Sequence, residues 1–417
     1  MVVSILWGWV GFVVCFMAVY AVRHMVLTAG RLFRPQRTAY HELLDSDQQP
    51  LSVLIPMHNE RAVAARVLGC VVEARSDNSL EVVPIDDHSE DETPDIVADY
   101  ASRYESIQPL TRRSGPRGKP AGLNDAMELT SHDATLVFDA DYEPSGELID
   151  GLASAFVDPE VGAVMGRVVP QNAATNLLTR LLDLERSGGY QVDQQQRHSM
   201  ALVPQYGGTV GGFRRSIMQR FGGFDVNVLA EDTDATYRLA SSGWRVSYVN
   251  WAECYEEVPT ALSGRFKQLR RWARGHTQVL FKRLGAVMRS PYLTLWQKVD
   301  SLLILFIYIV PPLLASGLLV NTTLFMLGEQ VGLATVALGL FAVAYNAFGN
   351  FAPFYQIGSA VLIDGGRQRL MLMPMLFAMY FVNTCAVSFG MVDALLDMAR
   401  GRAPTWDKTK RMEEASA

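Results

Sequence analysis

An uncharged apolar segment at the start of the chain restricts the fold more than any other feature. Residues 2–22 carry no charged side chain and approach the ~20 residues that a helix needs to cross a bilayer. Arg23, Arg31 and Arg34 follow this segment, and no basic residue precedes it. A cleaved signal peptide has a basic start and a shorter apolar centre. We therefore expect an uncleaved anchor over 1–24, with the N-terminus outside and the following domain in the cytoplasm, as in a bacterial-type inner membrane protein.

The chain becomes apolar again after residue 290, and we expect a transmembrane bundle over 301–396. Consecutive prolines in the first of its apolar segments favour a kink or an interruption. Basic residues in the short tail, 397–417, favour a cytoplasmic end, whereas Arg367 and Arg369 favour the opposite side, so three and four crossings both stay open. The candidate spans lie near 301–322, 331–348 and 370–393, with a shorter stretch at 350–363.

Composition excludes some classes of protein. The chain has 417 residues, of which 49% are hydrophobic and 19% charged, and its net charge of −6 excludes a broadly basic nucleic-acid-binding protein. The four cysteines are scattered, without a C-x-x-C pair or a zinc-like spacing. We expect reduced, structural thiols.

The middle of the chain, from about 40 to 262, alternates apolar runs with amphipathic segments. Such alternation predicts an α/β domain with a mostly parallel sheet and helices on both faces. The predicted strands are 52–56, 81–86, 135–141 and 161–169, and the predicted helices include 60–74, 91–103 and 120–129.

Polar side chains follow three of these predicted strands. In parallel sheets, ligands bind at the carboxyl ends of the strands, where these side chains are expected to meet. For Asp87 through Ser89 alone, capping of the next helix is the simpler alternative. The residues are Asn59 and Glu60, Asp86 and Asp87, and Asp139 and Asp141.

Asp139 and Asp141 predict a metal site. Carboxylates packed together repel and raise each other's pKa, unless a cation compensates their charge. Hard oxygen ligands suit Mg²⁺ or Mn²⁺, and Mg²⁺ favours one or two carboxylates together with substrate phosphates. We therefore expect a metal-bound diphosphate at these two residues.

Two glycine-containing segments and one acidic pair are further candidates. The segment 115–127 offers close backbone approach and the charge of Lys119, although a solvated loop explains it equally well. Gly207 and Gly208 repeat the glycine signal in 207–216. Glu231 and Asp232 begin a helical pattern. They either complement the helix dipole or supply a general base that deprotonates an attacking hydroxyl.

A basic amphipathic helix is predicted at 263–290. Its cations and its periodic apolar residues are typical of a helix at an anionic membrane surface. Gln268, Arg271 and Trp272 stand at i, i+3 and i+4, hence on one face, where they are suited to grip a diphosphate and stack on a sugar. Trp272 is equally suited to an interfacial aromatic belt.

The order of these motifs resembles that of family 2 membrane glycosyltransferases of the GT-A fold. The processive cellulose, hyaluronan, chitin-type and poly-N-acetylglucosamine synthases are similar in pattern, over roughly 50–290 and the flanking anchors. The motifs are Pro56-x-x-Asn59-Glu60, Asp86-Asp87, Gly118-Lys119 with Asn124, Asp139-x-Asp141, Gly207-Gly208, Glu231-Asp232 and Gln268-x-x-Arg271-Trp272.

The resemblance implies a hexosyltransferase and a role for each motif. Asp86 or Asp87 would contact the uridine, Lys119 would help to hold the donor, and Asp232 would be the catalytic base. Asp139 and Asp141 would bind the donor diphosphate and the metal. Asn59, Glu60, Asn124, Gly207, Gly208 and Glu231 would line the substrate site, and Gln268, Arg271 and Trp272 would hold the pyrophosphate and the acceptor end.

The implied reaction is inverting transfer from a nucleotide-diphosphate sugar, with UDP-glucose or UDP-N-acetylglucosamine as the donor. The resemblance favours elongation and export of a β-linked polysaccharide; glycosylation of one membrane lipid is the alternative. Two other classes of protein are disfavoured. One is a nucleotide-binding transport or scaffold protein. The other is a nucleotidyltransferase, a reaction that gives no role to Gln268, Arg271 and Trp272. The sequence does not define accessory subunits.

Overall fold

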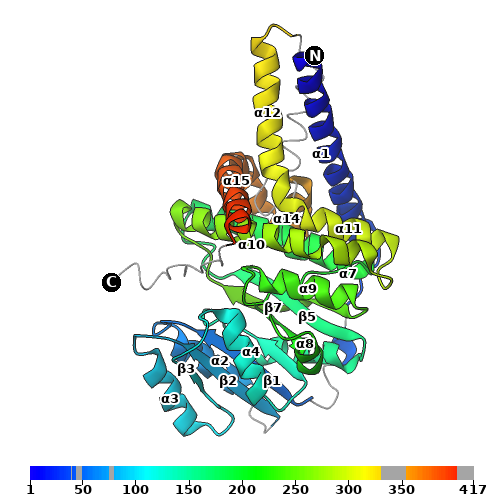
Figure 1. The fold of residues 1–417 in the computed structure, drawn as a ribbon. Coiled ribbons are helices and arrows are strands. Elements are labelled where there is room, and N and C mark those ends of the chain that lie inside the picture. Colours follow the sequence, from blue (N-terminus) through cyan, green and yellow to red (C-terminus); the bar gives the residue numbers. More distant parts are fainter. Residues whose placement is uncertain (39, 44–48, 75–78, 330–353, 402–417) are drawn as a thin grey trace.

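The computed structural model describes residues 1–38, 40–43, 49–74, 79–329 and 354–401. An α/β domain forms one end of the molecule, and long apolar helices extend from the other (Figure 1). The predicted α/β fold with a mostly parallel sheet is confirmed. The four cysteines form no disulfide, as expected.

In the part of the chain that the structure describes, seven strands form a single sheet in the order β3-β2-β1-β4-β6-β5-β7. β1 pairs in parallel with β2 and β4, and β2 pairs in parallel with β3. β6 runs antiparallel to β4 and β5, whereas β5 and β7 are parallel. The strands are β1 (Leu51–Met57), β2 (Leu80–Asp87), β3 (Leu110–Arg112), β4 (Ala134–Val137), β5 (Val161–Pro170), β6 (Gly211–Arg214) and β7 (Arg245–Glu256).

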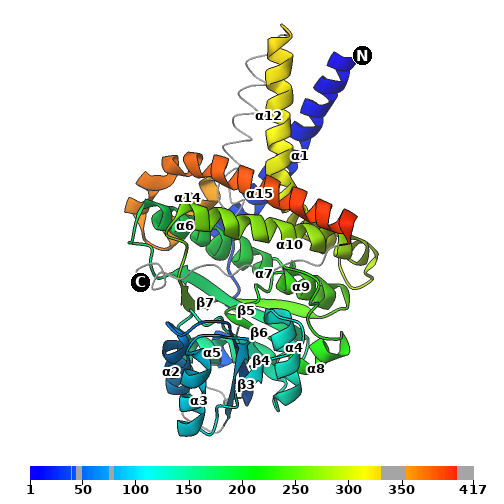
Figure 2. The ribbon, with the colours of Figure 1, turned by 60° about the vertical axis from the view of Figure 1, so that its left-hand side comes forward.

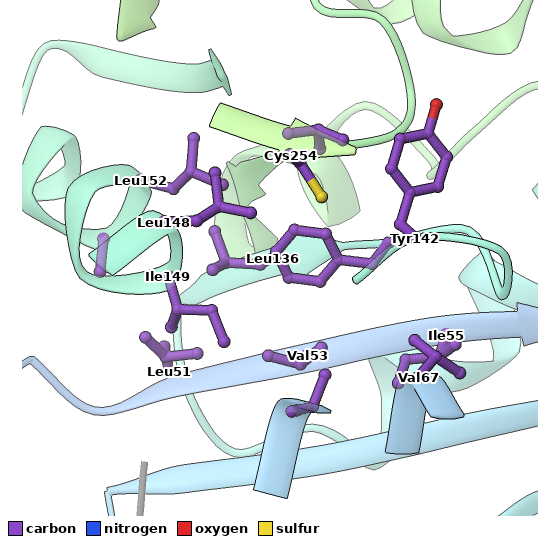
Figure 3. Packing of buried hydrophobic residues seen from close by; sticks show 14 of the residues in the cluster. Leu51, Val53, Ile55, Val67, Leu136, Tyr142, Leu148, Ile149, Leu152 and Cys254 are labelled. Carbon is purple, nitrogen blue, oxygen red and sulfur yellow. The ribbon is translucent and has the colours of Figure 1, made fainter. Parts of the chain in front are cut away.

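Helices cover both faces of the sheet because each presents an apolar stripe to it. One buried core joins the sheet to α2 (Ala64–Ala74), α3 (Thr93–Arg103) and α5 (Gly146–Ser154). Figure 3 shows part of this core, where Val53 and Leu136 from two strands lie near Ile149 of α5. The opposite face packs on α4 (Lys119–Leu129), α8 (Arg215–Arg220) and α9 (Glu231–Ser241).

A layer of helices separates the sheet from the long apolar helices (Figure 2). It contains α6 (Leu177–Ser187), the π-helical segment η3 (Gly188–Gln194), α7 (Gln195–Ser199) and α10 (Leu262–Arg289). The predicted amphipathic helix at 263–290 corresponds to α10. Short 3₁₀ turns lie at η1 (His41–Leu43) and η2 (Ala155–Val157).

Among the described residues, three helical segments are long and apolar enough to cross a membrane: Val2–Phe33, Leu295–Met326 and Arg367–Arg400. The predicted spans at 301–322 and 370–393 fall within the second and third. The span at 331–348 lies outside the described residues, as do 350–353 and the tail beyond residue 401. The elements are α1 (Val2–Phe33), α11 (Leu295–Leu305), η4 (Ile307–Ile309), α12 (Val310–Met326), α14 (Phe354–Ile363), η5 (Arg367–Met375) and α15 (Leu376–Arg400).

A buried network of ion pairs joins the first helix to the α/β domain. Arg23 of α1 contacts Asp193 of η3 at 2.6 Å and Asp300 of α11 at 2.7 Å. Arg197 of α7 completes the network, 3.1 Å from Asp300. Since removing one partner of a buried ion pair leaves the other charge uncompensated, this network fixes α1 and α11 relative to the domain.

Candidate active site

The sheet brings the predicted polar strand ends together. β2, β1 and β4 are parallel neighbours, and Met57 at the end of β1 is paired with Asp86 of β2. The segments after these strands therefore share one edge of the sheet. β4 ends at Val137, so Asp139 and Asp141 lie in the following turn and not in the strand.

Asp139 pairs with a lysine from the neighbouring helix. Lys119, the first residue of α4, donates from Nζ to Asp139 Oδ1 at 2.5 Å. The Asp139 side chain stays 31% exposed, whereas Asp141 is buried. One carboxylate of the predicted metal site thus already has a cation beside it, and it remains partly exposed.

Lys119 links Asp139 to the second acidic pair. Burial of the ammonium opposes its charge, but Asp139, Glu231 and Asp232 outweigh this effect and raise the pKa of Lys119. The amine is therefore protonated at neutral pH. Its electrostatic contact with all three carboxylates shows that the end of β4 and the start of α9 form one site.

Glu231 and Asp232 occupy the first turn of α9. The Thr233 backbone N–H donates to Asp232 Oδ1 at 2.6 Å, and burial raises the pKa of the Asp232 carboxyl. Burial, followed by the neighbouring Asp232 charge, raises the pKa of Glu231 to about 7. Adjacent carboxylates with raised pKa values are expected of groups that transfer protons near neutral pH.

We expect a pH dependence from this pair. The two carboxylates interact, the pKa of Glu231 is raised to about 7 and that of Asp232 is raised as well. The first proton taken up near neutrality is therefore shared by the pair, and kcat/KM for glycosyl transfer should fall on the acid side of neutrality. Glu231→Gln should shift this acidic limb to lower pH, since only Asp232 then titrates. A pH series with native and Glu231→Gln protein tests this. A native profile that is flat across neutrality would contradict the assignment.

Gly208 fits closely against the side chain of Asp232. Its φ of +71° lies in the left-handed region. A Cβ built on Gly208 would lie 2.9 Å from Asp232 Cβ and 3.3 Å from Oδ2. A side chain at residue 207 would instead meet the Met165 thioether. The two predicted glycines are thus explained by close approach to residues of the site and its supporting core.

Gly208→Ala is expected to reduce transfer by about 10- to 100-fold, because it displaces Asp232 from its position. Gly222→Ala is the matched control: Gly222 has a φ of +79°, but nothing lies within 4 Å of its Cβ position. Both variants should lose about 1 kcal/mol of stability from the strained backbone. Initial rates and thermal unfolding of both proteins check this. Equal activity of the two would show that the contact with Asp232 is unimportant.

Asp86 and Asp87 have different surroundings. Asp87 Oδ2 accepts from the Gly118 N–H at 2.6 Å, and Oδ1 contacts the Arg112 guanidinium. Asp86 Oδ1 accepts from the Ser89 N–H, and Oδ2 lies 2.9 Å from the half-exposed Arg113. Asp87 thus orients the turn before Lys119 and does not cap α3, so the capping alternative is wrong for this residue.

Three other predicted site residues form hydrogen bonds that hold the loops around the site in place. The Asn59 N–H donates to Ser89 Oγ at 2.9 Å, and the buried Glu60 donates its N–H to Thr93 Oγ1 at 2.8 Å. The Asn124 amide bonds both backbone groups of Phe224, at 2.7 and 2.8 Å. This placement gives Asn124 a positioning role, because its amide is already used on the loop that leads to α9.

Of the three predicted site residues on α10, Arg271 is the one whose charge acts on Glu231 and Asp232. Its charge lowers the pKa of both Glu231 and Asp232 against the stronger effect of burial. Gln268 Oε1 instead accepts from Arg265 at 2.9 Å. The Trp272 ring has the guanidinium carbons of Arg186 and Arg265 at 5.3 and 5.7 Å from its centroid. Sugar stacking on Trp272 stays a prediction, since cations now lie against this ring.

Most of the basic side chains that predicted a cationic surface for α10 are paired with acids within the protein, whereas the placement of α10 at a membrane surface stays a prediction. Five of its basic side chains form ion pairs with acids from other elements. These pairs are Arg265–Glu185, Arg270–Asp393, Arg274–Asp397, Lys282–Asp225 and Arg283–Asp234.

Sequence reasoning missed two residues that bring α10 to the site. A Cβ on Gly275 would lie 2.8 Å from the Ala230 nitrogen, so only glycine allows this approach to the residue before Glu231. His276 Nδ1 lies 3.5 Å from Thr233 Oγ1, and burial lowers the pKa of His276 to about 4, which keeps the ring neutral. Gly275 and His276 stand three and four residues after Trp272, hence on the same face of the helix, and this spacing was the signal in the sequence that could have identified them.

A family profile described as "Glycosyltransferase like family 2" matches residues 48–275, more than half of the chain. The chain therefore belongs to this family, which confirms the predicted glycosyltransferase class and its GT-A type of domain. The similarity to processive polysaccharide synthases stays a prediction.

Several curated proteins are similar to this chain. "Probable glycosyltransferase YdaM" of Bacillus subtilis is 32% identical over 239 residues, covering 56% of this chain and 57% of that protein. "Beta-monoglucosyldiacylglycerol synthase" of Trichormus variabilis is 28% identical over 304 residues, covering 69% and 65%. "Glucomannan 4-beta-mannosyltransferase 7" of Arabidopsis thaliana is 27% identical, covering 59% and 46%. The matches span less than two thirds of each relative's length.

Among solved structures, the mannosyltransferase PcManGT from Pyrobaculum calidifontis, in complex with GDP-Man and Mn²⁺, has a TM-score of 0.63 at 19% identity. The match covers 95% of this chain and 99% of that chain. At this identity the likeness establishes the shared fold.

Proposed function

We propose that this protein is an inverting hexosyltransferase that moves a sugar from a nucleotide-diphosphate donor to a hydroxyl group of a membrane lipid. One observation carries the proposal: the Glu231–Asp232 pair lies beside the Lys119–Asp139 pair and directly against α10, the helix next to the apolar segments. A donor-binding edge and a candidate base thus share one site on the membrane side of the domain.

Asp232 acts as the general base in this proposal. Its carboxylate takes the proton of the acceptor hydroxyl while the hydroxyl oxygen forms a bond to the anomeric carbon. The bond from that carbon to the donor phosphate breaks, and its electron pair leaves with the nucleoside diphosphate. Attack occurs opposite the departing group, so the anomeric configuration inverts. Negative charge develops on the leaving nucleoside diphosphate. The positive charges of Lys119 and Arg271 lie close to Asp232 and would stabilise this negative charge.

Asp139 and Asp141 fit a divalent cation that is shared with the donor. Among the described residues, no group of three His, Cys, Asp or Glu side chains can hold an ion alone. Two carboxylates, one of them accessible, suit Mg²⁺ or Mn²⁺ when phosphates complete the coordination. When bound, the ion would offset charge on the leaving diphosphate. PcManGT, with Mn²⁺ in its complex, is consistent with this choice.

The donor is proposed to be UDP-glucose or UDP-N-acetylglucosamine, with UDP-glucose tested first because a relative is named a monoglucosyldiacylglycerol synthase. We assign the uridine contact to Asp86. Both oxygens of Asp87 are held by Arg112 and Gly118, whereas among the described residues Asp86 Oδ2 has only the half-exposed Arg113 beside it, at 2.9 Å.

The acceptor is proposed to be a lipid because of how the apolar helices pack. α1 and α12 lie in direct contact: a Cβ on Gly317 would be 2.9 Å from Val13. Trp9 also donates to Ser316 Oγ at 3.1 Å. These two helices therefore pack directly against each other. A lipid acceptor needs no passage between them, because it reaches the site along the membrane surface.

Elongation and export of a β-linked polysaccharide is the second candidate, favoured by the motif order and by relatives named glucomannan mannosyltransferases. Both candidate functions require the catalytic domain to lie on the cytoplasmic side of a bacterial-type inner membrane, because sugar nucleotides are made in the cytoplasm. The basic residues after the first apolar segment favour this orientation.

Product size distinguishes the two. Purified protein in lipid vesicles is incubated with radiolabelled UDP-glucose or UDP-N-acetylglucosamine and Mn²⁺, and the products are separated by solvent extraction and thin-layer chromatography. We expect one organic-soluble glycolipid. Labelled polymer that remains in the aqueous phase and is cut by a β-glycanase would replace the lipid proposal with the polysaccharide one. Absence of nucleoside diphosphate release with every sugar nucleotide would overturn both.

A further inference from the structure

α15 carries an apolar stripe that the rest of the described chain leaves exposed. Phe377, Phe381 and Phe389 are 45%, 67% and 57% exposed, whereas Tyr380 and Val387 on the other side are buried. Residues spaced by three or four share one face of a helix. The stripe consists of Phe377, Phe381, Cys385, Phe389, Val392 and Leu396.

The direction of α15 differs from that of the other apolar helices. α1 and α12 extend away from the catalytic domain, whereas α15 lies across their base, alongside α10 (Figures 1 and 2). A Cβ on Gly390 would lie 2.3 Å from the Arg270 carbonyl oxygen, so the two helices touch at their backbones there. Length and composition make α15 a candidate span, but its packing places it parallel to the surface of the domain.

The charges of α15 support this orientation. Asp393 pairs with Arg270 at 2.5 Å, and Asp397 pairs with Arg274 at 2.5 Å. Both acids thus point toward α10, away from the stripe. In a membrane-crossing orientation these carboxylates would approach the hydrocarbon, where ionised groups are strongly disfavoured. Alongside α10 they are neutralised, and only apolar side chains face outward.

We propose that α15 lies in the plane of the membrane, with its stripe embedded among the acyl chains of the leaflet next to the catalytic domain, and does not cross the bilayer. α1 and α12, which also expose apolar side chains, extend away from the layer that contains α15 (Figure 2). Beyond the end of α10, Tyr292, Leu295 and Trp296 are exposed as well, as is typical of aromatic and apolar residues at a membrane interface. α10 is then held at the level of the lipid headgroups. This inference concerns membrane geometry and holds for either proposed acceptor.

Depth measurement along α15 tests the embedding. In a Cys15→Ser, Cys70→Ser background, a fluorophore is attached to Cys385, or to Phe377→Cys or Val392→Cys in proteins that also carry Cys385→Ser. Quenching by lipids brominated at different acyl positions is then compared. We expect one shallow depth for all three positions. A crossing helix of 25 residues spans ~37 Å, so depths that pass through the bilayer centre would overturn the proposal. Probes left unquenched, as beneath a second copy of the chain, would also overturn it.

Sidedness gives a second test that does not alter the stripe. Arg400→Cys, Glu92→Cys and Met326→Cys place exposed thiols after α15, on the catalytic domain and at the end of α12. A membrane-impermeant maleimide applied to vesicles of defined orientation should label positions 400 and 92 from one side and position 326 from the other. Labelling of position 400 together with 326 would show that α15 crosses.

Discussion

Replacing Asp232 with asparagine is expected to lower the rate of glycosyl transfer by about 10²- to 10⁴-fold, the range associated with loss of a general base. The amide has the size of the carboxylate, and its oxygen still accepts the Thr233 N–H. It takes no proton from an acceptor hydroxyl, however. Release of nucleoside diphosphate from the sugar nucleotide by purified protein measures the effect.

Asp225→Asn is the matched control for this experiment. Asp225 also pairs with a side chain of α10, Lys282, but it lies outside the site, and the hydrogen bond from Lys282 helps to hold the pKa of Asp225 below its usual value. Loss of this exposed pair should cost little, within about 1 kcal/mol of stability, and should leave the rate unchanged. Comparable rates for the two variants would remove Asp232 from the role of base.

Asp139→Asn should have the second largest effect, a decrease in kcat/KM of about 10²- to 10³-fold. The substitution removes a proposed metal ligand and also the nearest counter-charge of Lys119, 2.5 Å away. The dependence of the rate on Mn²⁺ concentration should weaken as well, because the ion loses one of its two protein carboxylates. Titration of activity with Mn²⁺ for native and variant protein measures both effects.

Asp133→Asn tests whether the loss is specific to the site. Asp133 precedes β4, whereas Asp139 follows it, so the two carboxylates lie at opposite ends of one strand. Asp133 accepts the Ser216 N–H at 2.8 Å and pairs with Arg214. Its replacement should lower thermal stability while preserving the response to Mn²⁺. A similar loss of activity from both substitutions would indicate general damage to the strand.

The sequence was sufficient to predict strands whose side chains are almost all buried. β1, β2 and β5 consist mostly of apolar residues, and their predicted limits agree with the structure within one or two residues. β6 was missed because two of its four residues are glycine, so its pairing between β4 and β5 comes from its neighbours. β7 mixes polar and apolar residues over its length, which hides the pattern of a strand.

The site was predictable where topology alone assembles it. Asp86 lies near the end of β2 and Asp139 follows β4. Both strands pair in parallel with β1, so the shared edge follows from the fold. The partners of polar side chains were not predictable in the same way. Asn124 bonds to Phe224, 100 residues away, and Arg270 pairs with an acid 123 residues away. The sequence shows that a side chain is polar, but its hydrogen-bond or ion-pair partner is known only from the packed structure.

The proposed mechanism is a single displacement at the anomeric carbon, in which the Asp232 carboxylate of α9 activates an acceptor held at the membrane side of the domain. The stereochemistry of the product tests this most directly. Purified protein is given UDP-glucose, in which the sugar is α-linked, together with lipid acceptor, and the anomeric configuration of the new bond is determined by NMR. A β-linked product is predicted, and an α-linked product would contradict the mechanism.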